Sequence, residues 1–311
     1  MFCSRLHYLC IWIGYTLQRG EGKALPEPSA QYEPNKKKDN MKKILAFAFT
    51  ILTSASMICS CGGSQQGSKK GADSLTFDSI VVDTTASLTE KADSPCCEVK
   101  IAFTFAKGAN ADAINQAIVK SGILVPDYLS GMENNKDMQA VVDTFVNRLI
   151  ADYINTFKPL YQADRDSRSL STVYNVSGKI TDGPDGVKVY TADVYQFAGG
   201  AHGSLQTIVN NIDIRKGRVL TLKDLFVPGG EMKMKELIVE RMMRAERVKT
   251  FKELQNKGYF MDMEAYVPDN FILGDKEITF LYNADEIAPH ALGPVHVTFT
   301  YSELEKIMKK I

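Results

Sequence analysis

Hydrophobic and polar residues alternate in several short runs after Cys97, and this alternation predicts β-strands with one buried face. The first run places Val99, Ile101, Phe103 and Phe105 on one side. Further strands are expected at 171–180, at 187–197, around 208–214, at 278–282 and at 295–301. The turn sequence Asp-Gly-Pro-Asp-Gly at 182–186 joins two of these strands, which predicts an antiparallel hairpin.

Other segments repeat hydrophobic residues every three or four positions, which is the spacing of an amphipathic helix. The longest runs from Met138 to Phe157, and we expect Pro159 to stop it. Shorter helices are predicted at 111–120 with Asn110 as its cap, at 234–248 and at 302–311. Because strands and helices do not alternate regularly, the predicted fold class is α+β: an antiparallel curved sheet with helices on one face, in two lobes.

A short apolar segment near the N-terminus has the layout of a lipoprotein export signal. A charged start at 41–43 is followed by an apolar run at 44–57 and then by Cys61. The run is shorter than the ~20 residues that span a bilayer, which favours a cleaved signal over a retained anchor. Small Ser60 precedes Cys61, so Cys61 is the expected lipidation site. An uncleaved anchor and ordinary secretion are the alternatives.

This signal sets the expected domain organisation. A signal acts from the N-terminus, so we expect translation to begin at Met41 and residues 1–40 to be a mis-assigned upstream stretch. Residues 41–60 form the signal, and 61–96, rich in Gly, Ser, Asp and Thr, are expected to form a flexible tether. An N-terminal α+β lobe at 97–168 and a C-terminal α+β lobe at 169–311 follow.

The tether contains three Asp-Ser or Asp-Thr triplets, at 73–75, 78–80 and 83–85. They resemble the O-glycosylation acceptors of some Gram-negative envelope proteins. Such triplets also recur by chance in linkers of this composition, so both interpretations stay open.

Charge and cysteine content bear on several functional classes. The chain has 37 Lys and Arg against 37 Asp and Glu, so no basic field indicates nucleic-acid binding. Of the six cysteines, only Cys96 and Cys97 are expected to remain as thiols in the folded part. Neither a C-x-x-C motif nor a zinc-ligand spacing is present, so we expect no metal and no cofactor.

The search for catalytic motifs finds no nucleophile elbow, zinc-protease helix, Walker loop or dinucleotide-binding loop. His202 is the histidine of interest, because Gly199, Gly200 and Gly203 around it allow positive φ angles and close backbone approach. Its imidazole could orient a ligand or bind a metal, or it could fasten the loop through backbone bonds. With no second ligand at metal spacing, the structural role is favoured. We therefore predict no catalytic residue, and enzymatic activity would need an unrecognised constellation.

Three stretches together resemble a known module: 195–203, which runs from Tyr195 to Gly203, then Asn-Ile-Asp at 211–213, and Leu-Thr-Leu-Lys-Asp-Leu-Phe at 220–226. They are similar to the envelope domain of RsiV-type anti-sigma factors, which sense lysozyme. The same module resembles the N-terminal, non-catalytic part of PdaC-type peptidoglycan deacetylases. Residues 282–304 fit its end, and the match extends over roughly 97–311.

The resemblance implies an α+β module in two lobes that works at the cell wall. It does not carry over an activity, because the chain ends where a deacetylase domain would begin. We therefore expect a non-catalytic, lipid-anchored binding module on the outer membrane, facing the periplasm. Its partner would be a lysozyme-like envelope protein, a peptide or a peptidoglycan fragment, bound near Tyr195, Gly199, Gly200, His202 and Gly203. The alternatives are a hydrolase built around His202 and a membrane-anchored anti-sigma-type sensor.

Overall fold

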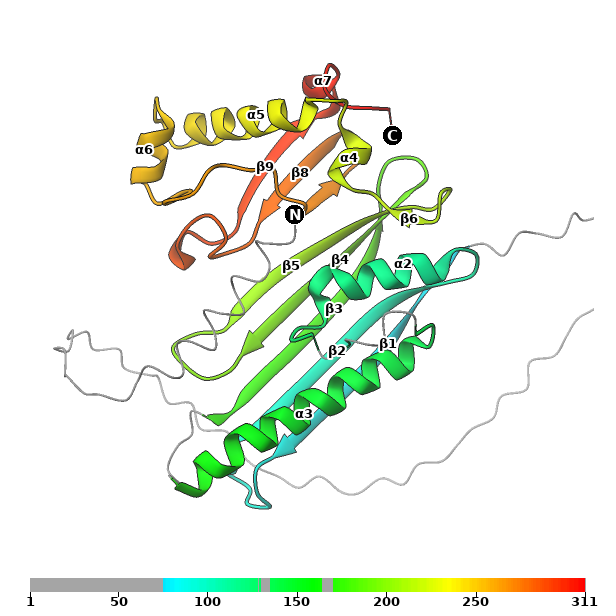
Figure 1. Cartoon of the computed structure of the whole chain (residues 1–311), viewed down its shortest axis with the longest axis vertical. Coiled ribbons are helices and arrows are strands. Elements are labelled where there is room, and N and C mark those ends of the chain that lie inside the picture. Colours follow the sequence, from blue (N-terminus) through cyan, green and yellow to red (C-terminus); the bar gives the residue numbers. More distant parts are fainter. Residues whose placement is uncertain (1–74, 128, 130–134, 164–169, 311) are drawn as a thin grey trace, which may run out of the picture. The chain divides into compact units, whose positions relative to one another are not determined.

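The computed structural model describes residues 75–127, 129, 135–163 and 170–310, all within the compact unit Gln66–Ile311. Two sheets organise this part of the chain (Figure 1). The larger has six strands in sequence order: β1 (Thr76–Ser87), β2 (Cys96–Lys107), β3 (Thr172–Asp182), β4 (Val187–Phe197), β5 (Ser204–Asp213) and β6 (Arg218–Val219). All neighbours are antiparallel except β2 and β3, which are parallel.

The parallel pair explains where the helices of this part lie. Parallel neighbours need a long crossover connection, and here the crossover carries α2 (Ala111–Ile118), the π-helical turn η1 (Val119–Ile123) and α3 (Met138–Ala163). Figure 1 shows α2 and α3 across one face of the sheet. Alternate residues of β2, such as Val99, Ile101 and Phe103, point to that face and are almost fully buried with Phe145 of α3.

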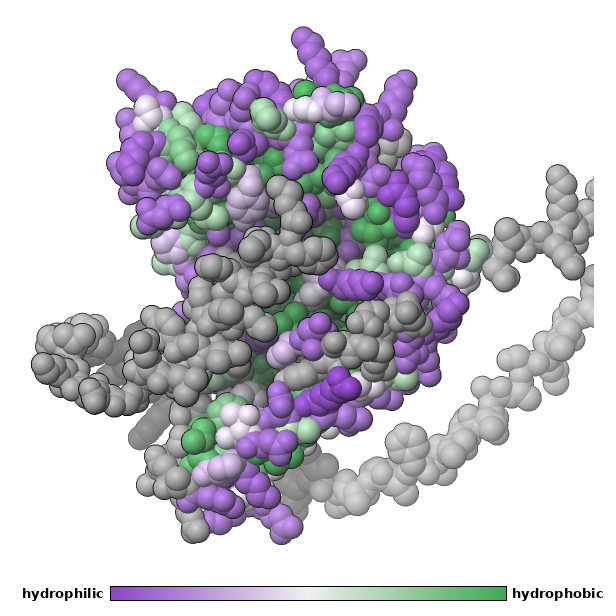
Figure 2. All heavy atoms as spheres, in the orientation of Figure 1, coloured by the Kyte–Doolittle hydropathy of each residue, from purple (hydrophilic) through white to green (hydrophobic). Residues whose placement is uncertain are grey.

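The second sheet has three antiparallel strands, β7 (Phe271–Leu273), β8 (Glu277–Tyr282) and β9 (Val295–Thr300). The chain reaches it through α4 (Leu222–Leu225), α5 (Gly230–Ala245) and α6 (Phe251–Asn256). The 3₁₀ turn η3 (His290–Leu292) links β8 to β9, and α7 (Tyr301–Leu304) follows β9. This part has its own core, in which Met234 and Ile238 of α5 are buried with Phe280 of β8. The outward side of α5 is largely hydrophilic (Figure 2).

The predicted fold class is confirmed: the chain is α+β, with a curved, mainly antiparallel sheet, helices on one face, and a second smaller sheet. Two helix boundaries were wrong. The α3 helix continues through Pro159 to Ala163, and its last turns stay in place partly because Tyr161 is buried against the core. The predicted helix at 302–311 is only the four residues of α7, since Phe226 and Met308 then form a β-bridge.

The prediction of a flexible tether at 61–96 is wrong for residues 76–87. They form β1, which pairs with β2 along all twelve residues in continuous register. Ile80 is buried under the helices and Val82 packs beside it, so this segment contributes to the core despite its polar composition. Residues 61–74 lie outside the described residues, as do the signal at 41–60 and residues 1–40.

The expected boundary between lobes at 168/169 is also wrong. Strands β3, β4 and β5 belong to the same sheet as β2, and Tyr174 and Val194 share the first core with α3. The second core is built almost entirely from residues after Val219. The division between the two cores therefore falls near 219/220, because the parallel pairing of β2 with β3 carries the first sheet across the expected boundary.

The helices of the described residues include none that is both long and apolar enough to cross a bilayer. Cys96 and Cys97 are both free thiols there, and Cys97 is buried at the start of β2. Burial raises the pKa of both thiols. Both thiols therefore lie where β2 begins and have little tendency to ionise.

Candidate functional site

The outer edge of β5 is covered by side-chain amides from the second sheet. The Asn270 side chain accepts a hydrogen bond from the Val209 N–H (2.8 Å) and donates one to the Thr207 carbonyl (2.8 Å). Asn283 accepts from the Thr207 N–H (2.7 Å) and donates to the same carbonyl (3.2 Å). These amides occupy backbone groups that an exposed edge strand would leave open. We call this contact the asparagine seam, defined by Asn211, Asn270 and Asn283.

Asn211 completes the seam, because its side chain belongs to β5 and bonds to the backbone of β7. It lies on β5 and is 1% exposed. Its side chain donates to the Phe271 carbonyl (2.7 Å) and accepts from the Leu273 N–H (3.0 Å), so it pairs with β7 as a neighbouring strand would. The seam fixes how the two sheets meet, and it therefore fixes which loops lie together at their ends.

The Gly199–Gly203 loop connects β4 to β5 at one end of the sheet. Gly199 and Gly200 have φ angles of 84° and 100°, which a side chain would strain, and the space around Gly200 is open. Gly203 is needed for a different reason. A Cβ atom there would lie 2.5 Å from the ring of Tyr195, so the ring rests directly on the Gly203 backbone.

The loop meets the β8–β9 connection through two stacked histidines. The rings of His202 and His290 lie 4.1 Å apart between centroids, with 19° between their planes. His290 Nδ1 lies 2.8 Å from the Asp285 carboxylate, and His202 Nδ1 lies 3.1 Å from the Gly203 carbonyl. Both histidines are exposed.

Hydrogen bonds with neighbouring residues fix the turn that leads to His290. The Glu286 carboxylate accepts hydrogen bonds from the Asn283 N–H (2.8 Å) and from the Tyr266 hydroxyl (2.6 Å). The Phe260 N–H in turn donates to the Ile287 carbonyl (2.6 Å). Burial raises the pKa of Tyr282, whose hydroxyl donates to the Tyr266 carbonyl (2.5 Å). His290 therefore stands on a rigid, hydrogen-bonded support.

Tyr195 belongs to the sheet face that points away from α2 and α3. Its cross-strand neighbours are Asn175 on β3 and Leu205 on β5, and residues directly opposite each other share a face. Leu205 is 54% exposed, and Tyr195 is partly exposed. We use the name loop–turn surface for Tyr195, the Gly199–Gly203 loop, Leu205, Asp285 and His290.

The loop–turn surface combines aromatic, apolar and hydrogen-bonding groups without an evident reaction centre. Among the described residues no group of three or more His, Cys, Asp or Glu side chains is placed to hold a metal ion. The rings of His202 and His290 stack face to face, so their in-plane lone pairs do not converge on one point. The arrangement is suited to holding a ligand by stacking and hydrogen bonding.

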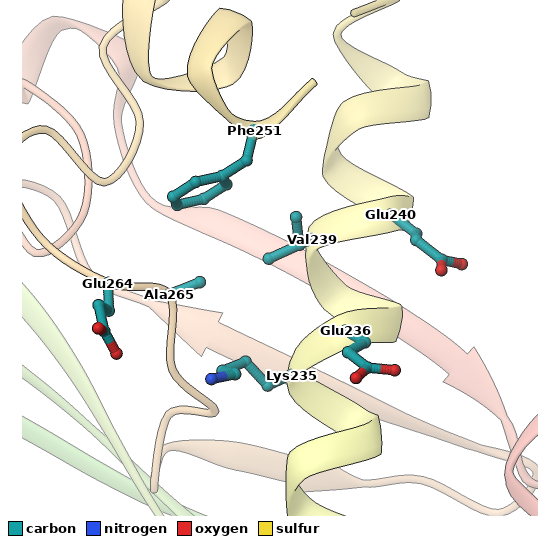
Figure 3. Close-up of a pocket in the computed structure, with 7 residues that line it drawn as sticks. All are labelled: Lys235, Glu236, Val239, Glu240, Phe251, Glu264 and Ala265. Atoms are coloured by element: carbon teal, nitrogen blue, oxygen red, sulfur yellow. The ribbon is translucent and has the colours of Figure 1, made fainter. Parts of the chain in front are cut away.

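A separate hollow of about 510 Å³ lies between α5, α6 and the segment at 264–265. Val239, Phe251 and Ala265 form its apolar lining, and Figure 3 shows Lys235 and Glu264 on facing sides of it. Figure 3 also shows Glu236 and Glu240 directed away from the hollow. It shares no lining residue with the loop–turn surface. The hollow is open to solvent.

The structure brings all five predicted binding residues to one place: Tyr195, Gly199, Gly200, His202 and Gly203. The predicted lipidation site, Cys61, lies outside the described residues. Sequence reasoning missed the partnership of His290 with His202. No short spacing links two residues so far apart along the chain, so the sequence gives no signal for this contact.

The fold defines an α+β protein with two sheets joined by an asparagine seam, and the comparisons give it a family context. Residues 223–302 match the family model described as "Protein of unknown function (DUF3298)". The chain is also similar to a solved DUF3298-family protein from Bacteroides fragilis NCTC 9343. That match has a TM-score of 0.66 and 26% identity, and it covers 78% of this chain and 96% of the other.

A second solved structure, a DUF3298-family protein from Pseudomonas aeruginosa PAO1, matches with a TM-score of 0.45 and 18% identity. It covers 76% of this chain and 96% of the other. The comparison with curated proteins gives no match. The B. fragilis similarity covers much more of the chain than 223–302, so the likeness in fold extends beyond the segment that matches the family model.

Proposed function

We propose that this protein is a non-catalytic binding module of the cell envelope, which recognises a protein, peptide or cell-wall glycan through the loop–turn surface. The observation that carries the proposal is the stacking of His202 on His290. It joins two connections from different sheets into one exposed surface, beside the partly exposed ring of Tyr195. Binding residues concentrate on loops that a rigid scaffold positions, and here the seam and Glu286 supply that rigidity.

The chemistry of the surface fits a ligand with both flat apolar and hydrogen-bonding parts. Exposed Leu205 (54%) follows the loop on β5, and exposed Leu292 (48%) belongs to the turn that begins at His290, so both offer apolar contact beside the two connections. The imidazole Nε2 atoms donate or accept hydrogen bonds, depending on tautomer. A sugar ring or a peptide side chain with a polar end satisfies both requirements.

The proposed location is the periplasmic side of the outer membrane, where a lipid on Cys61 anchors the protein. It is supported by the export-signal pattern at 41–60 and by the resemblance of 195–226 to the RsiV-type envelope domain and the PdaC-type module. Mass spectrometry of the mature N-terminus tests it. A diacylglyceryl cysteine at position 61 is expected. An intact segment at 41–60 would instead favour the anti-sigma-type topology.

Binding is tested with lysozyme and with soluble peptidoglycan fragments as the two probes, using isothermal titration calorimetry. We expect one of them to bind the wild-type protein, and His202→Ala to weaken that binding at least ~tenfold, a typical loss for a central contact. Met232→Ala, at a 67% exposed position on α5, is the matched control and should bind normally. The proposal fails if neither probe binds, or if His202→Ala binds as tightly as the control.

A hydrolase is the second candidate, and one observation favours it. Asp285 and His290 form the carboxylate–imidazole pair that orients a general base in many hydrolases, with 2.8 Å between the two groups. If this pair acts in catalysis, incubation with peptidoglycan should release fragments, and Asp285→Asn should abolish the release. Wild-type protein that binds peptidoglycan without releasing any fragment would exclude this candidate for that substrate.

A further inference from the structure

Strand β1 ends the six-stranded sheet, and its outer edge pairs with no other strand among the residues that the structure describes. Figure 1 shows β1, in cyan, as the outermost strand on its side of the sheet. The strand has twelve residues, Thr76–Ser87, and its pairing with β2 has no bulge. A long edge of this kind presents a row of backbone N–H and C=O groups to any strand that approaches.

Natural edge strands are usually protected against pairing by charged residues, especially lysine, by proline, by a bulge or by short length. β1 has no lysine, no proline, no bulge and twelve residues, and its only charged residues are Asp78 and Asp83. Its sequence, TFDSIVVDTTAS, is also rich in β-forming residues, and Val81 at its centre is 75% exposed. The opposite edge of the same sheet differs: β6 is only two residues long, and the asparagine seam covers β5.

We infer that β1 is an interface for a second copy of this chain, in which two β1 strands pair antiparallel about a two-fold axis at Val81. The axis places Val81 opposite Val81, and Ile80 opposite Val82. It also places Asp83 opposite Ser79 and Asp78 opposite Thr84. Apolar residues therefore meet apolar ones at the centre, and each carboxylate meets a hydroxyl that can donate to it.

The positions of the two carboxylates on β1 favour this register, and they favour a second copy of the chain as the partner. Moving the pairing by two residues either way places Asp83 opposite Phe77 or Val81, neither of which can donate a hydrogen bond to the carboxylate. In the proposed register no two carboxylates face each other. Within each copy, Lys107 lies 2.5 Å from Asp78, and Lys100 stands opposite Asp83 on β2. The edge therefore needs no basic partner to neutralise it.

The pairing would join the two six-stranded sheets into one continuous sheet. Residues opposite each other share a face, so the helix-covered faces of both copies point the same way. Val81 and Val81 would meet on the open face, flanked by two Ser79–Asp83 pairs. This surface is distinct from the loop–turn surface, so dimerisation and ligand binding are independent properties.

Sedimentation velocity of the full chain in detergent, over a wide range of concentration, tests the inference. The wild-type protein is expected to dimerise. Val81→Lys and Val81→Asp should each be monomeric at concentrations where the wild type is dimeric, because each places like charges at the axis. An equimolar mixture of the two variants should dimerise again, since opposite charges then meet. Met232→Lys, at an exposed position on α5, is the control and should dimerise normally.

A second variant tests the register by strengthening the dimer. Ser79→Lys places a cation opposite Asp83 of the other copy, twice per dimer, and should tighten the dimer several-fold. Circular dichroism checks that each variant is folded. A wild-type protein that stays monomeric overturns the inference. So does dimerisation of both Val81 variants alone, or failure of their mixture to re-associate.

Discussion

The imidazole ring of His202 stacks on that of His290, with 4.1 Å between the ring centroids. One ring comes from the β4–β5 loop of the six-stranded sheet and the other from the β8–β9 connection of the three-stranded sheet. The stack therefore couples the two sheets at the loop–turn surface, in the same way that the asparagine seam couples them along β5.

Stacking of the two rings should be measurable as a coupling energy. We expect His202→Ala and His290→Ala each to destabilise the protein slightly, and the double variant to lose less than their sum by about 0.5–1 kcal/mol. Chemical denaturation of the four proteins checks this. Strictly additive losses would mean that the stack makes no net contribution.

Gly203→Ala should destabilise the protein by roughly 1–3 kcal/mol, the usual cost of overpacking. The added Cβ would lie 2.5 Å from the Tyr195 ring, so the ring must move off the loop. The same variant should weaken ligand binding, because Tyr195 is part of the loop–turn surface. Thermal unfolding and titration of the ligand measure the two effects.

The control for this prediction is Gly200→Ala. Its φ angle of 100° makes alanine costly there, although no atom lies within 4 Å of the added Cβ. Combining each variant with Tyr195→Ala separates the two causes. Removing the ring should relieve the Gly203→Ala penalty and leave the Gly200→Ala penalty unchanged. Relief of both, or of neither, would contradict the packing argument.

Asn211→Ala should cost about 2–4 kcal/mol of stability, because it leaves the Phe271 carbonyl and the Leu273 N–H unpaired in a buried place. Asn210→Ala is a matched control on the same strand. Its side chain is also buried, but its amide nitrogen has no hydrogen-bond partner. We expect a clearly smaller loss at Asn210. Equal losses in urea unfolding would show that the seam adds nothing beyond packing.

The loss of folding stability at low pH should depend on Asp224. The Arg218 guanidinium, bound to it at 2.6 and 2.9 Å, holds the pKa of this carboxyl well below its usual range, and hydrogen bonds from Thr221 lower it further. Because the folded-state pKa is lowered, the stabilisation is complete above the unfolded-state pKa of about 4 and is lost as the pH falls toward the folded-state value.

Asp224→Asn removes this contribution. We expect the variant to be less stable than the wild type by roughly 1–2 kcal/mol at neutral pH, since it loses a charge-assisted pair and a helix cap. The difference should shrink as the pH falls below about 4. Unfolding curves at several pH values measure it. A difference independent of pH would mean that the charge of Asp224 is not the cause.

Periodicity predicted most of the fold because local burial determines it. The β3–β4 hairpin and the strands β2, β8 and β9 follow directly from alternation and turn residues. β1 was missed because Asp, Ser and Thr hide its alternation, and its pairing with β2 is a tertiary property. The lobe boundary was missed for a related reason: the parallel pairing of β2 with β3 joins residues on both sides of it.

The candidate site was predicted in part. The glycines around His202 marked the loop, because they signal close backbone approach, and Tyr195 indeed rests on Gly203. His290 and Asp285 were not connected to it, since their contact depends on how the two sheets meet. The seam that sets this arrangement consists of asparagines, whose pairing with a distant backbone leaves no periodic signal.

Hydrogen–deuterium exchange with and without ligand is the most direct test of the binding surface. Using whichever probe binds, lysozyme or peptidoglycan fragments, we predict new protection at 195–206 and 283–292, with none of it in His202→Ala. Protection confined to the hollow between α5 and α6, around Lys235 and Phe251, would contradict the account and place the ligand elsewhere.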